Sequence, residues 1–185
     1  MEQPGDRHAA PQSLRLVQDL VNTVDLEDAE SDALGSPEAL AAWAREHGIT
    51  AGGGFDWAGL DMVLTLREAL RDACSAHAGT DMAPEAVAAL DGLLAAAPLR
   101  LAVDAAGAAT VVPGPTDDGV AALTAQVAAA IAAAAADGTW HRLKACAADT
   151  CRWAYYDRSP AGRGRWCSMA VCGSRAKMRA YRGRK

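Results

Sequence analysis

The residues best suited to chemistry are four cysteines near the C-terminus, which form two pairs of identical spacing. Cys146 and Cys151 make the first C-x4-C pair, fifteen residues follow, and Cys167 and Cys172 make the second pair. A structural zinc ion needs four thiolate or imidazole ligands at the corners of a tetrahedron. Two short loops that each deliver a pair meet this demand, so the spacing predicts one closed, structural Zn²⁺ site.

Three other interpretations of the same cysteines stay open at this stage. Two disulfides fit the spacing, although regularly clustered cysteines in a reducing cytosol are more typical of metal ligands or reactive thiols. Nearby arginines would lower the thiol pKa values, so a zinc site that oxidation empties is a second alternative. An iron–sulfur cluster held by four thiolates is a third.

No stretch of the sequence predicts secretion or a membrane location. No early segment combines a basic start, an apolar run and a small-residue cleavage site. The longest apolar stretch, residues 127–136, is mostly alanine and is shorter than the roughly 20 residues that cross a bilayer. We therefore expect a cytoplasmic protein without a membrane partner.

The net charge of −5 conceals two segments of opposite charge. Residues 1–140 contain 6 Lys and Arg against 21 Asp and Glu, a balance of −15, whereas residues 141–185 contain 12 against 2, a balance of +10. Such asymmetry indicates two parts with different partners. We place an acidic, alanine-rich domain over residues 1–140 and a basic module over residues 141–185.

Apolar residues recur at helical spacing through the acidic part, which predicts a multihelical, mainly α domain. Residues 1–12 are polar and contain prolines, so a loose lead-in is expected before a first helix that Ser13 caps. Ser36, followed by a first-turn proline, starts a second helix. Weak alternation around a central glycine predicts a small β-hairpin of residues 99–104 and 108–112. The expected helices cover residues 13–26, 37–46, 56–77, 84–96 and 117–136.

The basic module is too small to fold on apolar burial alone. About forty residues with few aliphatic side chains make an inadequate core, and metal binding supplies the missing free energy. Residues 153–156 alternate like a strand and residues 159–164 are rich in turn formers, so a hairpin is expected between the two cysteine pairs. Ser174 can then cap a short helix. The module is thus predicted to be a four-cysteine zinc unit with a hairpin and a short helix.

A dense set of cations surrounds this predicted metal site. The phosphate backbone of DNA is the polyanion that such a set fits, although the cations could instead pack on the acidic domain or remain solvated. Tyr155, Tyr156 and Trp166 either stack on bases or, as we favour, fill the small core of the module. The candidate nucleic-acid contacts are Arg158, Arg163, Arg165, Arg175, Lys177, Arg179 and Arg182.

The residues around the four cysteines resemble the CGNR zinc finger. The similarity lies in RLKAC at 142–146, YDRS at 156–159, RWCSM at 165–169 and VCGSRAK at 171–177. It implies a bacterial, stress-induced transcription regulator with the finger behind a mainly helical, alanine-rich domain, whose usual start resembles DLVNTV at 19–24. Ser174 stands where the motif of that family has asparagine. Both residue types can cap a helix, so the fold is expected to survive the change.

These observations predict a zinc-containing DNA-binding regulator. The finger would contact nucleic acid, and the helical domain would sense a small-molecule effector or a protein partner. The alternative is a zinc-stabilised protein-interaction adaptor without specific DNA binding. An enzyme is not expected, because four cysteines leave zinc no open position and the chain has no Ser-His-acid set, Walker loop or paired-histidine motif.

Overall fold

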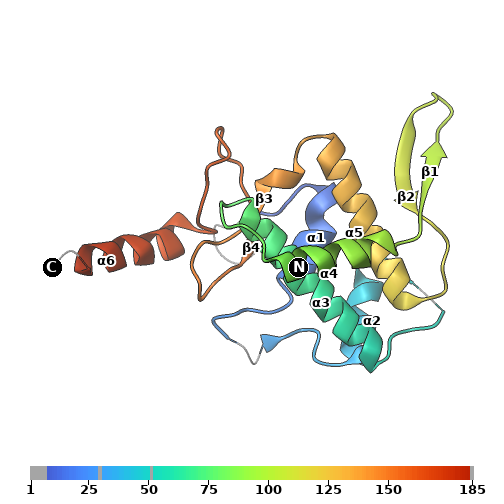
Figure 1. The fold of residues 1–185 in the computed structure, drawn as a ribbon, viewed down its shortest axis with the longest axis horizontal. Coiled ribbons are helices and arrows are strands. Elements are labelled where there is room, and N and C mark those ends of the chain that lie inside the picture. The colour runs from blue at the N-terminus through green and yellow to red at the C-terminus, as the bar shows by residue number, and fades with distance from the viewer. Residues whose placement is uncertain (1–7, 29–30, 51, 184–185) are drawn as a thin grey trace.

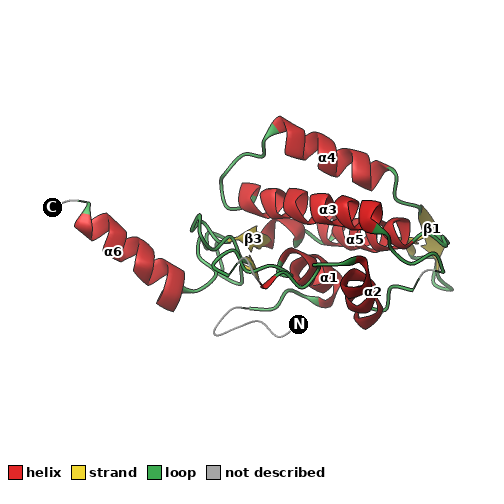
Figure 2. Ribbon diagram, turned by 90° about the horizontal axis from the view of Figure 1, so that it is seen from below, coloured by secondary structure: helices red, strands yellow, loops and turns green. Residues whose placement is uncertain are grey.

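The helices of the acidic part lie in layers around one core. The computed structural model describes residues 8–28, 31–50 and 52–183. In Figure 2, α3 and α5 form the middle of the domain, α4 covers one side, and α1 and α2 cover the other. This arrangement confirms the mainly α prediction. The helices are α1 (Gln12–Val21), α2 (Pro37–Glu46), α3 (Trp57–Ala76), α4 (Pro84–Ala95) and α5 (Gly119–Ala136).

Three of these helices begin with a side-chain cap. Ser36, Asp56 and Asp118 each accept a hydrogen bond from the backbone N–H three residues later, at 3.2, 2.7 and 2.7 Å. Such caps satisfy one of the N–H groups that a helix leaves without an intrahelical partner. The predicted cap at Ser36 is confirmed, and the short polar residues ahead of α3 and α5 explain where those helices start.

The start of α1 differs from the prediction. The helix begins at Gln12 and its preceding residue is Pro11, so the prediction that Ser13 caps it is wrong. The helix ends at Val21, so its predicted extension to residue 26 is also wrong. Residues 1–7 of the predicted loose lead-in lie outside the described residues. The described remainder is held in place: the Ala10 N–H donates to Gln18 Oε1 at 2.7 Å, and Gln18 Nε2 donates to the His8 carbonyl at 3.1 Å.

Helix α5 is the most apolar element of the domain. Its apolar character extends beyond residues 127–136 to the whole helix, which by length and composition alone could cross a membrane. However, Leu123 and Val127 have no exposed surface and α5 packs against α1, α3 and α4. These contacts are typical of the core helix of a folded domain.

The small hairpin of the acidic part is confirmed. Strands β1 (Leu99–Val103) and β2 (Ala109–Pro113) pair antiparallel, with Leu101 opposite Val111. The hairpin projects from one end of the molecule, while the C-terminal helix projects from the other (Figure 1).

The second hairpin is formed by different segments of the chain from those predicted. Strand β4 (Ala154–Tyr156) forms where a strand was expected, but it pairs antiparallel with β3 (Leu143–Ala145), which precedes the first cysteine pair. The prediction of a hairpin between the two cysteine pairs is therefore wrong. The first pair lies in the connection between β3 and β4, and the turn-rich residues 159–164 form a separate loop.

The chain ends in a continuous helical segment. A π-helical turn, η3 (Met169–Gly173), leads directly into α6 (Ser174–Arg182). Ser168 caps this segment, since its Oγ accepts from the Val171 N–H at 3.3 Å. Ser174 lies inside the segment and its Oγ donates to the Met169 carbonyl at 3.2 Å. The prediction that Ser174 caps the helix is therefore wrong, because the helical segment already starts one turn earlier.

Candidate metal centre and basic surface

The first cysteine pair is presented by the end of the β3–β4 hairpin. The Cys146 N–H donates to the Trp153 carbonyl at 3.0 Å, which continues the ladder one step past β3. The chain then turns, with the Cys151 N–H donating to the Ala148 carbonyl at 2.8 Å. Arg152 follows with a φ of 46°, the left-handed region that few non-glycine residues adopt. This tight turn brings both thiols to the same side of the hairpin.

The second pair comes from the loop before η3 and from η3 itself. Cys167 lies at the end of the loop and Cys172 within the π-helical turn. Gly173 follows Cys172 at a crowded position, because a Cβ atom there would lie 3.0 Å from the Met169 sulfur. The Met169 side chain therefore packs directly over Gly173, next to Cys172.

The four sulfur atoms form the set that a tetrahedral metal ion requires. All four thiols are buried, and their Sγ atoms lie within 4.8 Å of one another. Sγ of Cys167 is 3.7 Å from Sγ of Cys151 and 3.8 Å from Sγ of Cys172. A tetrahedron with Zn–S bonds of about 2.3 Å has S···S edges of about 3.8 Å, whereas a disulfide needs about 2.05 Å. The arrangement fits zinc and excludes the paired-disulfide interpretation.

The environment of these thiols also favours a bound cation. Burial raises the pKa of the Cys172 thiol, and the neighbouring thiols of Cys146, Cys151 and Cys167 raise it further. Several thiolates in one buried pocket are costly without a positive charge between them. A divalent ion removes this cost, since the ligands bind in their deprotonated form.

The prediction that the aromatic residues fill the core of the finger is confirmed for Tyr155 and wrong for Tyr156. Tyr155 packs with Trp153 around the cysteines, while Tyr156 belongs to the main core of the helical domain. Both tyrosines are buried, so the alternative in which they stack on bases is wrong. Trp166 is half-buried against the cysteine cluster, and the Arg165 guanidinium lies 5.7 Å above its ring.

A polar contact that the sequence did not predict joins the finger to the helical domain. Asn22, at the end of α1, accepts a hydrogen bond from the Ala154 N–H and donates one to the Ala154 carbonyl, both at 2.8 Å. Gln18 donates to the same carbonyl at 3.1 Å. The buried Arg71 on α3 donates to the carbonyls of Val21 and Arg152. These side chains fix the edge of β4 on the helices.

Two cations of the finger hold its own fold, and a third attaches it to the helical domain. Lys144 is buried and its Nζ lies 3.0 Å from Asp157 Oδ2 and 2.5 Å from the Gly162 carbonyl. Although burial opposes it, hydrogen bonds from Ser159, Lys144 and Gly164 lower the pKa of Asp157 to about 2. Arg142 donates to the carbonyls of Asp157 and Ser159, and Arg152 pairs with Asp72 on α3 at 2.5 Å.

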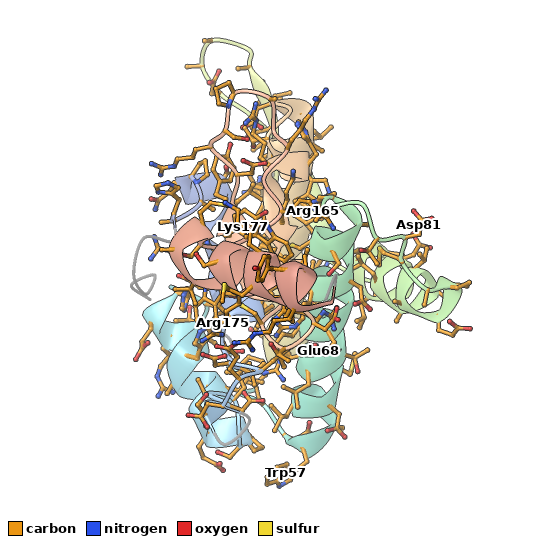
Figure 3. All side chains as sticks on the ribbon, turned by 90° about the vertical axis from the view of Figure 1, so that its left-hand side faces the viewer. Trp57, Glu68, Asp81, Arg165, Arg175 and Lys177 are labelled. Carbon is orange, nitrogen blue, oxygen red and sulfur yellow. The ribbon has the colours of Figure 1, made fainter. Side chains whose placement is uncertain are left out.

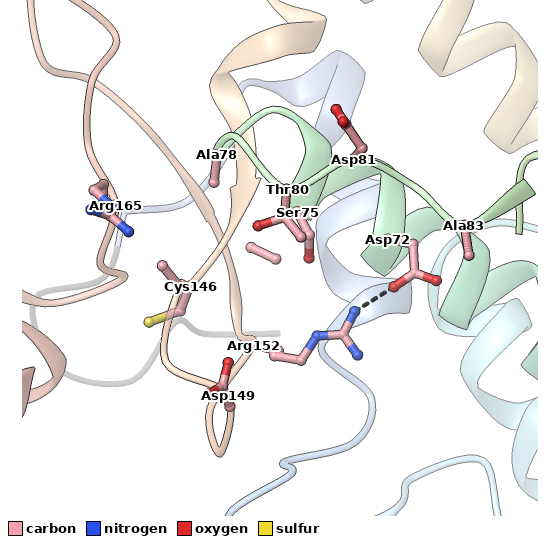
Figure 4. A pocket seen from close by; sticks show the side chains of 12 residues that line it. Asp72, Ser75, Ala78, Thr80, Asp81, Ala83, Cys146, Asp149, Arg152 and Arg165 are labelled. Atoms are coloured by element: carbon pink, nitrogen blue, oxygen red, sulfur yellow. Dashed lines mark hydrogen bonds and ion pairs between the residues drawn. The ribbon is translucent and has the colours of Figure 1, made fainter.

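The pair between Arg152 and Asp72 borders a cleft of about 340 Å³ between the helical domain and the first cysteine loop (Figure 4). Ser75 and Thr80 line the cleft from the end of α3 and the loop after it. Cys146 and Arg165 line it from the finger. A small molecule in this cleft would therefore contact both parts of the chain.

The seven cations predicted to contact nucleic acid are all exposed. Two of them contact the helical part: the Arg175 guanidinium pairs with the Glu27 carboxylate, and Arg158 donates to the Ala9 carbonyl at 3.1 Å. Figure 3 looks toward α6 and shows Arg165 and Lys177 above it and Arg175 below it. The seven residues therefore form a distributed basic surface around α6 and the loop before the second cysteine pair.

Comparison with known protein families assigns both parts of the chain. Residues 142–185 match the CGNR zinc finger. Residues 14–138 match the ABATE domain, described as a putative stress-induced transcription regulator, and this match alone spans more than half of the chain. The chain belongs to the ABATE family. A comparison with curated proteins finds no match.

In this ABATE protein the four clustered cysteines hold one structural zinc ion. Ser174, which replaces the asparagine of the finger motif, is exposed and bonds to the carbonyl of Met169. It does not belong to the cluster of four thiols. The substitution therefore leaves the metal ligands unchanged.

Proposed function

We propose that this protein is a zinc-dependent, DNA-binding transcription regulator that acts in the cytoplasm. The observation that carries the proposal is the division of the cations in the finger. Arg142, Lys144 and Arg152 are engaged by neighbouring groups. The seven predicted contacts are all exposed, including Arg158 and Arg175, which also contact the helical part. A cluster of exposed cations on a metal-supported scaffold can neutralise DNA phosphates and release the counterions that surround them.

Zinc would act in this proposal as a scaffold and not as a reagent. It would fix the loop before the second cysteine pair and the base of α6, and so hold the basic surface in one arrangement. The four thiols leave no ligand position for a water or a substrate. We therefore propose no catalytic role for the metal.

The helical domain would carry the regulatory input. The cleft between α3 and the first cysteine loop supports a small-molecule effector, because a ligand there would contact Arg152 and Asp72 and would touch both parts of the chain. Exposed apolar residues on β1, Leu101 at 69% and Val103 at 68%, instead support a protein partner. This second observation favours the alternative of a zinc-stabilised adaptor.

Binding of the full chain to duplex DNA, measured by fluorescence anisotropy over a salt series with and without a zinc chelator, tests the proposal. We expect affinity to fall steeply with salt and to disappear when the chelator removes zinc. Binding that is unaffected by the chelator would contradict the zinc-supported mechanism. Absence of salt-sensitive DNA binding, together with a stable protein complex through the helical domain, would support the adaptor instead.

A further inference from the structure

Apolar side chains are exposed beside three arginines on one face of the continuous helical segment formed by η3 and α6. Met178 is 54% exposed and Val171 is 38% exposed. They are seven residues apart, which is about two helical turns, so they lie above one another. Together with neighbouring residues they border a shallow hollow of about 470 Å³. Its lining residues are Ala170, Val171, Ser174, Arg175, Met178, Arg179 and Arg182.

This face is available to a large partner. Figures 1 and 2 show α6 extending away from the layered helices. One side-chain link between α6 and the helical domain is the exposed pair between Arg175 and Glu27. Such exposed pairs contribute about 0 to 1 kcal/mol. A polyanion can therefore replace Glu27 as the partner of Arg175 at little cost.

The charge of this face selects among possible partners. A second copy of α6 packed on it would bring together two sets of Arg175, Arg179 and Arg182, and like charges in close proximity are unfavourable. A neutral apolar partner would leave the guanidinium groups without partners. The face instead fits a surface that is anionic at its edges and apolar at its centre.

The major groove of DNA has this pattern. Phosphates border a groove about 12 Å wide, which admits an α-helix, and the 5-methyl group of thymine is the apolar group that it exposes. The nine residues of α6 rise about 13 Å at 1.5 Å per residue, which is close to the rise of four base pairs.

We propose that α6 enters the major groove and that Met178, supported by Val171, contacts thymine methyl groups, while Arg175, Arg179 and Arg182 contact phosphates and base edges. The proposal rests on the DNA binding proposed above and adds the groove, the reading helix and the class of base contact. It makes Met178 a specificity residue in a surface otherwise described by its charge.

Replacing thymine by uracil removes only the methyl group and so tests the contact directly. The zinc-loaded full chain is titrated against an alternating dA·dT duplex of about two helical turns and against the matching dA·dU duplex. We expect the wild type to bind the dA·dU duplex about fourfold more weakly for each thymine methyl group that Met178 contacts. The Met178→Ala variant should bind the dA·dT duplex more weakly by a similar factor and should no longer distinguish the two duplexes.

The Met62→Ala variant is the matched control, because Met62 is 47% exposed on α3 and does not belong to the α6 face. It should discriminate the duplexes like the wild type. Equal affinity of the wild type for both duplexes, or unchanged discrimination by Met178→Ala, would overturn the inference while leaving DNA binding intact. Binding to vesicles containing phosphatidylglycerol but to neither duplex would overturn both the inference and the proposed function.

Discussion

The two halves of the zinc finger differ in charge and in their relation to the rest of the molecule: residues 142–157 hold three Lys and Arg against two Asp, and residues 158–183 hold seven Lys and Arg and no Asp or Glu. The docked half, residues 142–157, packs its strands into the core of the helical domain. The projecting half, residues 158–183, extends away from it and ends in α6 (Figure 1). In the docked half the cations are bound by carboxylates and carbonyls, whereas in the projecting half the seven predicted contacts are exposed.

Two lysines of the finger show that a cation does not by itself mark a binding surface. Lys144 and Lys177 belong to the same finger, yet one is buried against Asp157 and the other is exposed. The docked half uses Arg142 and Lys144 to satisfy its own acceptors. The cations of the projecting half are exposed, although Arg158 and Arg175 also contact the helical part. Zinc links the two halves, because each half supplies two of its four ligands.

The largest expected effect comes from removing a metal ligand of the projecting half. Zinc binding contributes about 10 to 16 kcal/mol in isolated finger peptides, so Cys167→Ser should abolish stoichiometric zinc binding and DNA binding. Amide protons of residues 158–173 should lose their protection from hydrogen exchange. Those of β3 and β4 should stay protected, because these strands pack in the helical core. Loss of protection in both halves would show that they form one folding unit.

The two lysines offer the next comparison. Lys144→Met should destabilise the protein by about 3 to 5 kcal/mol, because it leaves the buried carboxylate of Asp157 without its partner. Lys177→Met, the same change at an exposed position, should alter stability by less than about 0.5 kcal/mol. Urea denaturation of zinc-loaded protein measures both. Similar decreases for the two variants would contradict the division of the finger.

A smaller decrease in stability is expected at the interface between helix and strand. Asn22→Ala leaves the Ala154 N–H without its Asn22 acceptor and deprives the Ala154 carbonyl of one donor. A buried polar group left unsatisfied costs about 1 to 3 kcal/mol, and we expect the free energy of unfolding to fall by about 2 to 4 kcal/mol. Gln126→Ala on the exposed side of α5 is the control. An unchanged free energy of unfolding in Asn22→Ala would show that the docked half does not depend on this interaction.

The smallest effects concern two histidines that titrate in opposite directions. A hydrogen bond with Asp19 raises the pKa of His47 above 6.5, whereas burial lowers the pKa of His77, which contacts the Leu143 carbonyl, below 6.5. His47 thus adds stability below pH 6.5, and this contribution disappears as pH rises through its folded pKa. His77 opposes folding as pH falls below 6.5. NMR titration of the imidazole protons measures both pKa values. The same titration midpoint for His47 and His77 would contradict the predicted opposite shifts.

Much of the architecture could be predicted because it depends on local sequence. The apolar spacing of Leu60, Val63 and Leu70 identifies α3 without knowledge of its neighbours, and the two C-x4-C pairs identify the metal site in the same way. Both kinds of signal lie within a few residues of what they specify. The helices and the cysteine cluster are confirmed for this reason.

The remaining features depend on contacts between distant residues. Asn22 and Ala154 are 132 positions apart, and a single asparagine at the end of a helix gives no sign of its partner. The strand β4 was predicted, but its partner β3 precedes it, on the other side of the first cysteine loop. The turn-rich residues 159–164 follow β4, so they wrongly predicted a partner strand after it. Serine is a residue type that often caps a helix, which made Ser174 a candidate. The π-helical turn that contains Cys172 starts the helical segment earlier.

The dependence of DNA affinity on salt tests the central claim most directly. For the zinc-loaded full chain, the slope of log K against log salt should fall in magnitude by about 1.8 when Arg179 and Arg182 are both replaced by alanine, since each phosphate contact contributes about 0.9. Replacing Arg45 and Arg100, exposed arginines of the helical domain, changes the net charge equally and should leave the slope unchanged. Equal changes for both pairs, or no change for the α6 pair, would contradict the claim that the projecting half binds DNA.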